Sequence, residues 1–271
     1  MESGTGVGSV INPRGTSGAG KTWLVREVTA AYRRGGADAV PPRRDGRSRP
    51  IGSRLLHPRG GRPLAVIGHY EATRGGTDTI PLADGGLDEA LRLADALAGD
   101  GHDVLLEGYR LSGEVGRTAA LARAQRARGG ELHVLCLDVP IERSVRNVVA
   151  RRRAGVAALP AIERTARAGQ AATAAACEAL RREGVRVERL DADAALRRTL
   201  ALLGLDPAAA WPAVAWRSIS RGGIGGDRAR GGVMSAEPMG DDGPGGGRRD
   251  DVSPGMLAAV HGGPAVAAGD P

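Results

Sequence analysis

The 271-residue chain contains little cysteine, few aromatic residues and no long apolar run. Its two cysteines, Cys136 and Cys177, lie far apart in the sequence, which excludes a disulfide framework and a cysteine-based zinc cluster and favours a reducing compartment. No apolar stretch approaches the roughly 18 residues needed to span a membrane. The first ten residues lack the basic and apolar regions of a signal peptide. We therefore expect a soluble, cytoplasmic protein without a membrane partner.

Lysine is nearly absent as well. The chain has 38 lysine and arginine residues in total, and Lys21 is the single lysine among them. Such a bias indicates coding composition, and it removes lysine wherever arginine can take its place. Arginine is a wide planar fork, whereas lysine is a compact point charge on a thin stem. We therefore expect Lys21 to occupy a site where arginine does not work.

The composition of the chain changes near residue 206. Residues 206–271 hold 15 of the 43 glycines and show no periodic apolar pattern. Such a segment cannot bury enough surface to offset the entropy of ordering it. We predict one folded domain over residues 1–205 and a disordered Gly/Pro-rich tail over residues 206–271. The tail carries more acidic than basic residues, so the domain is more basic than the whole-chain net charge of +7 indicates.

Strand-like and helix-like segments alternate along residues 1–205. Short apolar runs predict strands at 7–12, 51–56, 64–68, 104–106, 132–139 and 185–190. Apolar residues at helical spacing predict helices at 21–34, 87–97, 115–128, 141–153, 162–183 and 194–203. This alternation predicts a three-layer α/β fold, in which a parallel sheet carries helices on both faces.

The segment GTSGAGKT matches the phosphate-loop pattern G-x-x-x-x-G-K-[ST] at every fixed position. Glycines let the backbone curl so that its N–H groups surround phosphate oxygens, and the following helix points its positive end at the same anion. The pattern predicts a P-loop NTPase fold that binds ATP and Mg²⁺. The short strand before the loop, which Pro13 interrupts, departs from the usual pattern. The predicted ATP-binding residues are Gly15, Thr16, Ser17, Gly18, Ala19, Gly20, Lys21 and Thr22.

Two side chains of the motif have chemical roles, and a carboxylate from a later strand joins them. Lys21 is expected to act on the β- and γ-phosphates as a catalytic residue, and the Thr22 hydroxyl to hold Mg²⁺. The strand at 104–106 ends in Glu107, whose carboxylate can order Mg²⁺ or its water; the alternative is a surface glutamate at a strand end. A guanine-specific GTPase is excluded, because a chain with one lysine has none left for the N-K-x-D motif.

A basic helix follows the strand at 132–139. Arg146 and Arg151 lie five residues apart on it, as lid arginines do in small P-loop kinases of the nucleotide-kinase type. Arginine in a lid stabilises the charge that spreads over the transferring phosphoryl group. We expect Arg146 and Arg151 to be catalytic in this sense; the alternative is a solvated basic helix face.

An acceptor loop is predicted after the strand at 64–68. Ligands bind beyond the carboxyl ends of strands in doubly wound sheets, and a kinase needs a carboxylate to take the proton of the acceptor hydroxyl. We favour Asp78 for this role over Glu71, because Gly75 and Gly76 can fold the loop back toward the phosphate loop. A polar surface turn is the alternative. The expected substrate contacts are His69, Tyr70 and Glu71.

A resemblance to known proteins rests on the segments GTSGAGKTWLVR, LAVIGHYEATRGGTDTI, DVLLEG and LHVLCLDVP, together with the arginine lid. Over about residues 7–205 the chain resembles phage-type P-loop kinases, and among them the 5-hydroxymethyluracil DNA kinases. The resemblance implies a nucleotide-kinase-like fold and an enzyme that moves the γ-phosphate of ATP to the hydroxymethyl group of 5-hydroxymethyluracil in DNA.

One further feature bears on DNA as a partner. Residues 33–62 hold nine arginines against two aspartates, which is a charge pattern that neutralises DNA phosphates; an arginine-biased insertion is the alternative. Three functions remain open at this point. They are a kinase acting on a hydroxymethylated base in DNA, a kinase acting on a free nucleotide, nucleoside or other small hydroxyl-bearing metabolite, and an ATP-binding regulator without phosphotransfer.

Overall fold

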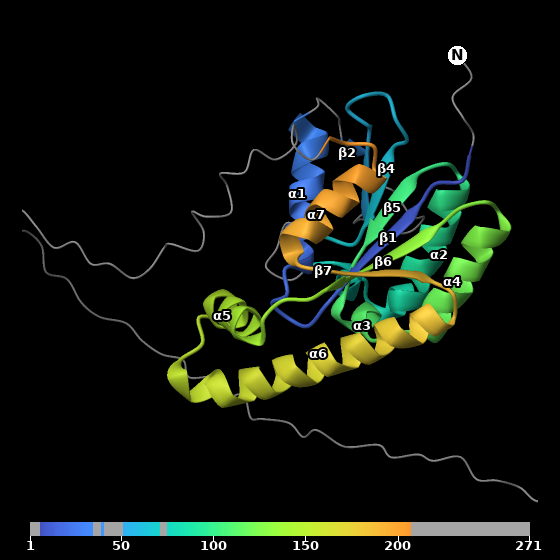
Figure 1. Cartoon of the computed structure of the whole chain (residues 1–271). Helices are drawn as coiled ribbons and strands as arrows, with labels where there is room; N and C mark the ends of the chain where they lie inside the picture. Colours follow the sequence, from blue (N-terminus) through green and yellow to red (C-terminus); the bar gives the residue numbers. More distant parts are fainter. Residues whose placement is uncertain (1–5, 35–38, 41–50, 71–74, 207–271) are drawn as a thin grey trace, which may run out of the picture. The chain divides into compact units, whose positions relative to one another are not determined.

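The computed structural model describes residues 6–34, 39–40, 51–70 and 75–206. The predictions for Glu71 and for the tail beyond residue 206 lie outside the described residues. A seven-stranded sheet runs in the order β2-β3-β4-β5-β1-β6-β7 (Figure 1). The strands are β1 (Val10–Arg14), β2 (Ala39–Val40), β3 (Gly52–Leu55), β4 (Leu64–Ile67), β5 (Asp103–Leu106), β6 (Leu132–Leu137) and β7 (Arg186–Leu190).

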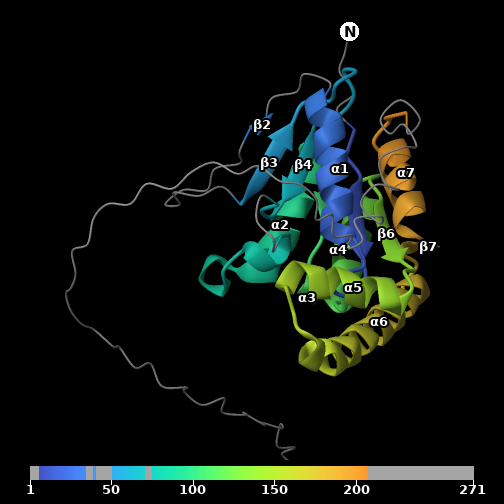
Figure 2. The ribbon, with the colours of Figure 1, turned by 90° about the vertical axis from the view of Figure 1, so that its left-hand side faces the viewer.

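Helices connect these strands and cover both faces of the sheet (Figures 1 and 2). The α-helices are α1 (Lys21–Arg34), α2 (Gly86–Gly99), α3 (Tyr109–Ser112), α4 (Gly116–Ala127), α5 (Ile141–Arg152), α6 (Leu159–Arg182) and α7 (Ala192–Leu202). Three short 3-10 helices are η1 (Thr77–Thr79), η2 (Leu82–Asp84) and η3 (Val156–Ala158). The described chain is therefore a mixed α/β fold, as the alternation of segments predicts, and none of its described helices is long and apolar enough to cross a membrane.

The sheet is mostly but not entirely parallel, which corrects the prediction of a parallel sheet. Strands β4, β5, β1, β6 and β7 are parallel, whereas β3 runs antiparallel to both β4 and β2. A tight turn, in which the Gly60 amide donates to the His57 carbonyl (3.1 Å), joins β3 to β4. A connection this short cannot make a crossover, so the two strands have to pair as a hairpin.

Strand β1 accommodates Pro13 in the centre of the sheet, although the sequence suggests an interruption there. The Val10 amide donates to the Glu131 carbonyl beside β6 (2.8 Å). Successive backbone amides of a strand point to alternate sides, so the nitrogen of Pro13, three residues later, faces β5. Pairing of β1 with β5 ends at Ile11, while pairing with β6 continues to Arg14. Pro13 has no amide hydrogen, but its nitrogen faces β5, with which pairing has already ended. The proline therefore removes no hydrogen bond from the sheet. The Asn12 side chain bonds the Leu106 carbonyl instead (2.9 Å).

Side-chain alternation along the strands builds two apolar cores. Ile11, Leu105 and Leu135 pack with α1 and α7 on one face, whereas Val104 and Val134 pack with α2, α4 and α6 on the other. Figure 2 shows α1 and α7 side by side on the first face. Cores on both faces are what period-two alternation produces in a covered sheet.

The two cysteines, which are distant in sequence, meet in the second of these cores. Cys136 lies on β6 and Cys177 on α6, and both are buried free thiols. The interaction of the two thiols lowers the pKa of Cys136 and raises that of Cys177. The separation of the two cysteines in the sequence gives no sign that they share one core, because this depends on the packing of β6 against α6.

Candidate functional site

The loop between β1 and α1 occupies the carboxyl edge of the sheet. Gly18 and Gly20 adopt positive φ angles of 84° and 101°, a region that glycine enters without steric cost. Among the described residues, none accepts a hydrogen bond from the amides of Ser17, Gly18 or Gly20. These donors lie just before the amino end of α1, so the loop has the composition and the free N–H groups of an anion site.

Lys21 opens α1 and points its side chain back into this loop. The ammonium donates to the carbonyls of Gly15 (2.7 Å) and Thr16 (3.2 Å), and the residue is 7% exposed. Burial lowers the pKa of Lys21, while the charges of Glu107 and Asp78 act in the opposite direction. The lysine is thus a buried point charge held inside the loop by backbone oxygens.

Glu107 comes directly after β5 and shares the α1 face of the sheet with Leu105, because the two are separated by one residue. It is 2% exposed, and its carboxylate accepts a hydrogen bond from the Thr22 hydroxyl (2.9 Å). Burial raises the pKa of Glu107, and the charge of Lys21 partly opposes this shift. A buried carboxylate is costly unless it is paired or binds a cation.

The loop after β4 folds onto these residues. Gly76 donates its amide to the His69 carbonyl (3.0 Å), and the Thr77 amide donates to the Glu107 carbonyl (2.8 Å). A Cβ on Gly76 would lie 2.3 Å from the Glu107 carbonyl oxygen, and one on Gly75 would lie 3.0 Å from the Thr22 methyl. Only glycine allows this approach, so the pair places the loop against both Thr22 and Glu107.

Asp78 is brought to the same place by that bend. Its carboxylate accepts hydrogen bonds from the amides of Tyr109 and, at 3.3 Å, Arg110. It is exposed, and its charge acts on the pKa values of both Lys21 and Glu107. The structure therefore gathers Lys21, Thr22, Glu107 and Asp78 at one edge of the sheet, although they come from three separate parts of the sequence.

The other predicted acceptor residues lie differently. His69 pairs through its backbone with Gly76, and its amide bonds the Thr79 hydroxyl (3.1 Å). Tyr70 packs against the α1-side core and donates its hydroxyl to the Ile67 carbonyl (3.2 Å). Burial raises the pKa of Tyr70, and the Glu107 carboxylate adds to the effect. Tyr70 also lines a pocket of about 590 Å³ between α1 and β4, whose other lining residues are Arg26, Thr29, Ala30, Arg33, Ser53, Val66 and Gly68.

Helix α5 packs one face onto the loop. The Asn147 side chain donates to the Gly18 carbonyl (2.8 Å), and a Cβ on Gly18 would lie 2.2 Å from the Ser144 carbonyl oxygen. Arg151 is four residues after Asn147 and so shares its face, and its charge acts on the pKa values of Lys21 and Glu107. Arg146 is exposed and lies about 140° around the helix from Arg151, because five residues make more than one turn. The structure brings Arg151, but not Arg146, to the loop-facing side.

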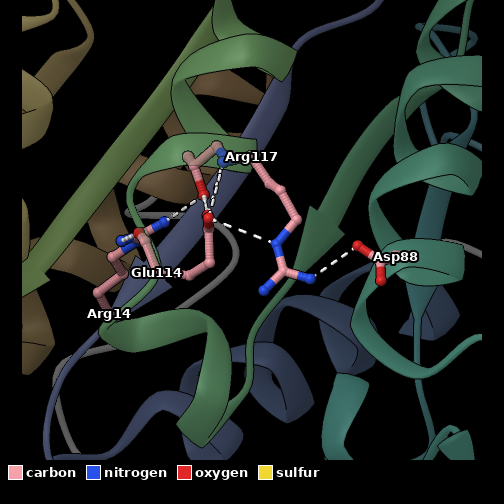
Figure 3. A network of polar contacts seen from close by, with 5 residues as sticks. Arg14, Asp88, Glu114 and Arg117 are labelled. Carbon is pink, nitrogen blue, oxygen red and sulfur yellow. Dashed lines mark hydrogen bonds and ion pairs between the residues drawn. The ribbon is translucent and has the colours of Figure 1, made fainter. Parts of the chain in front are cut away.

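A buried arginine anchors the start of the loop, which sequence reasoning missed. Arg14 is fully buried, and it donates to Asn12 Oδ1 (2.7 Å) and to the Thr118 hydroxyl (2.7 Å). It also donates to the Glu114 carbonyl (Figure 3). Desolvation lowers the pKa of Arg14 to about 10. In the same network the Glu114 carboxylate faces Arg117, which also bonds Asp88 (2.7 Å). In a chain this rich in arginine, nothing in the local sequence distinguishes Arg14 from an exposed arginine.

Helix α6, which packs against α5, also contacts the loop. The Thr16 hydroxyl donates to the Ala166 carbonyl (2.9 Å), and a Cβ on Gly169 would lie 2.6 Å from that hydroxyl oxygen. Neither contact has a local sequence signal, because each joins residues about 150 positions apart.

No protein-family model matches the chain. Among curated proteins, however, the chain has a kinase relative, and together with the site this makes it a phosphotransferase of the kinase class. The relative is the "5-hmdU DNA kinase" of Pseudomonas phage PaMx11, to which the chain is 35% identical over 195 residues, covering 72% of this chain and 96% of the relative. The chain belongs to the family of that kinase, which confirms the resemblance drawn from the sequence. A regulator without phosphotransfer is thereby set aside.

Proposed function

We propose that this kinase transfers the γ-phosphate of ATP to the hydroxymethyl group of 5-hydroxymethyluracil in DNA. The observation that carries the proposal is the convergence of Lys21, Thr22, Glu107 and Asp78 at the carboxyl edge of the sheet, in a chain whose relative is a 5-hmdU DNA kinase. A nucleotide site, a metal site and a proton acceptor are the three parts that phosphoryl transfer needs.

The loop from Gly15 to Thr22 would bind the phosphates of ATP as a P-loop does. The free amides of Ser17, Gly18 and Gly20 supply donors, and Lys21 exchanges its two carbonyl partners for phosphate oxygens. Thr22 and Glu107 would hold Mg²⁺, since hydroxyl and carboxylate oxygens are the ligands this cation takes. When bound, Mg²⁺ neutralises charge on the phosphates.

In the transfer step, Asp78 accepts a proton and Arg151 offsets negative charge. As the hydroxymethyl oxygen bonds to the γ-phosphorus, the bond from that phosphorus to the bridging oxygen breaks and ADP leaves. The proton of the hydroxyl passes to the Asp78 carboxylate, which its two backbone donors hold in place. Arg151 on α5 offsets negative charge near the loop.

DNA as the acceptor is supported by charge and by the relative. The net charge is +7, and the described part of the basic segment includes Arg33, Arg54, Arg59 and Arg62. Basic residues of this density release counterions from DNA phosphates on binding. A free nucleotide is a second candidate acceptor, because the 590 Å³ pocket beside Tyr70, with Arg26 and Arg33 in its wall, has the size of a small-molecule site.

The test is transfer of labelled γ-phosphate from ATP to three acceptors. These are a duplex with thymine, the matched duplex with 5-hydroxymethyluracil, and free 5-hydroxymethyl-deoxyuridine monophosphate. Label on the modified duplex alone supports the proposal. Label on the free nucleotide alone would make the enzyme a nucleotide kinase and would refute the DNA acceptor, and sensitivity of that reaction to Arg33→Ala would locate the nucleotide in the pocket beside Tyr70.

A further inference from the structure

Tyr109 has an unusual position for an aromatic side chain in this protein. The chain has three tyrosines, three tryptophans and no phenylalanine. Within the described ranges, Trp23, Tyr32 and Tyr70 pack in or against the α1-side core, whereas Tyr109 is 52% exposed. Tyr109 is thus an aromatic side chain that is open to a ligand, and aromatic side chains are among those that carry most binding energy at interfaces.

The position of Tyr109 is set by the site itself. It is the first residue of α3 and follows Glu107 by two residues. Its amide donates to the Asp78 carboxylate, and a Cβ on Gly108 would lie 2.2 Å from the Thr77 hydroxyl oxygen, so Tyr109 cannot move independently of Asp78. The backbone of Tyr109 therefore contacts the carboxylate that we assign to the acceptor hydroxyl.

Arg110, the residue that follows Tyr109, lines a cavity whose groups suit a nucleotide. Among the described residues the Arg110 side chain forms no ion pair, whereas neighbouring Arg117 is held by Asp88 and Glu114. Arg110 and Leu82 line one cavity of about 370 Å³, and Leu82 is 74% exposed. An aromatic face, an unpaired guanidinium and an exposed aliphatic side chain are the groups with which proteins hold a base that has left the stack.

We propose that Tyr109 is the stacking platform for the acceptor base, with Arg110 bound to a neighbouring DNA phosphate. A base can stack on a protein ring only when one of its faces is free, so the target nucleotide is extruded from the duplex or lies in a single strand. This inference rests on the proposed function, because it concerns the acceptor of that same reaction.

The variants that test the inference are Tyr109→Ala, Tyr109→Phe and Tyr109→Trp, with Val156→Ala as the control. Val156 is an apolar side chain that is 82% exposed on η3, and it belongs neither to the site nor to the basic segment at 33–62. Tyr109→Ala should reduce kcat/KM for the modified duplex by about 5- to 150-fold, which is the range for loss of one base–aromatic stack. Tyr109→Phe and Tyr109→Trp should stay within about threefold, since both retain a stacking face. ATP affinity should not change in any variant.

A second measurement reports the base directly. A duplex with 2-aminopurine beside the 5-hydroxymethyluracil should gain fluorescence with the wild-type enzyme, because extrusion unstacks the probe, and it should not gain it with Tyr109→Ala. Equal activity and equal fluorescence in Tyr109→Ala and Val156→Ala would overturn the inference and leave the proposed function intact. Absence of any transfer to modified DNA by the wild-type enzyme would overturn both.

Discussion

Gly76 is the point where the acceptor loop touches Glu107, so adding one methyl group there tests the geometry of the site. In Gly76→Ala, the new Cβ would lie 2.3 Å from the Glu107 carbonyl oxygen, whereas ordinary contact begins at 3.4 Å. The loop has to retreat by roughly 1 Å and carries Asp78 with it. A misplacement of about 1 Å can cost on the order of 100-fold in rate. We expect kcat/KM for the modified duplex to fall by that factor.

Gly60→Ala is the matched control for this substitution. Gly60 also has a positive φ, 74° against 83° at Gly76, but a Cβ on it would meet nothing within 4 Å. In urea unfolding, Gly60→Ala should lose about 1 kcal/mol from backbone strain, and Gly76→Ala should lose about 3 kcal/mol, because its ψ of −164° lies in a region that essentially only glycine adopts. Only Gly76→Ala should lose phosphate transfer, while its ATP affinity, measured by calorimetry, should equal that of Gly60→Ala. If the two variants transfer phosphate equally well, the contact between the acceptor loop and Glu107 does not position Asp78.

Three other predictions concern the lid, the loop anchor and pH. Arg151→Ala should lower kcat by about 100-fold and Arg146→Ala far less, because only Arg151 faces the loop; equal losses in a transfer assay would contradict the assignment. Arg14→Met should lower the unfolding free energy by about 3 kcal/mol, since two buried hydrogen bonds and one partly buried hydrogen bond are lost. The exposed pair of Arg167 and Glu163 predicts about 0.5 kcal/mol or less for Arg167→Met. Burial lowers the pKa of His133, which faces Glu131, Arg186, Arg198 and Glu188. The stability that this depressed pKa contributes is present above about pH 6.5 and is lost as pH falls through the folded-state value. The Tm of the wild type should therefore drop more between pH 7.5 and pH 5 than that of His133→Gln, and equal drops would exclude His133 as a cause.

Sequence patterns predict those helices, strands and bends whose structure depends on residues close to one another in the sequence. The helix at 21–34 has the predicted bounds, because a loop motif and an apolar period define it. The buried strand β6 begins at Leu132 as its run of apolar residues indicates. Gly75 and Gly76 bend the acceptor loop back onto the phosphate loop, since glycine is the residue that permits so close an approach.

Features that depend on distant residues could not be predicted in the same way. The antiparallel direction of β3 follows from a tight turn, while its strand pattern is the same for either direction. The anchoring role of Arg14 depends on Glu114 and Thr118, about a hundred residues away. The lid illustrates a third limit: a spacing of five residues identifies two arginines, but the packing of Asn147 on Gly18 decides which of them faces the loop.

The most direct test of the account is Lys21→Arg, assayed for transfer of the γ-phosphate to a duplex with 5-hydroxymethyluracil. Lys21 is the one lysine in the chain, and it is buried with its ammonium 2.7 Å from the Gly15 carbonyl oxygen. A guanidinium has the same charge but not the same shape. With Tm unchanged, the account predicts loss of transfer by about 100-fold or more, as for removal of a group that stabilises the transition state. Transfer within a few-fold of the wild type would contradict the claim that this loop holds the transferring phosphate.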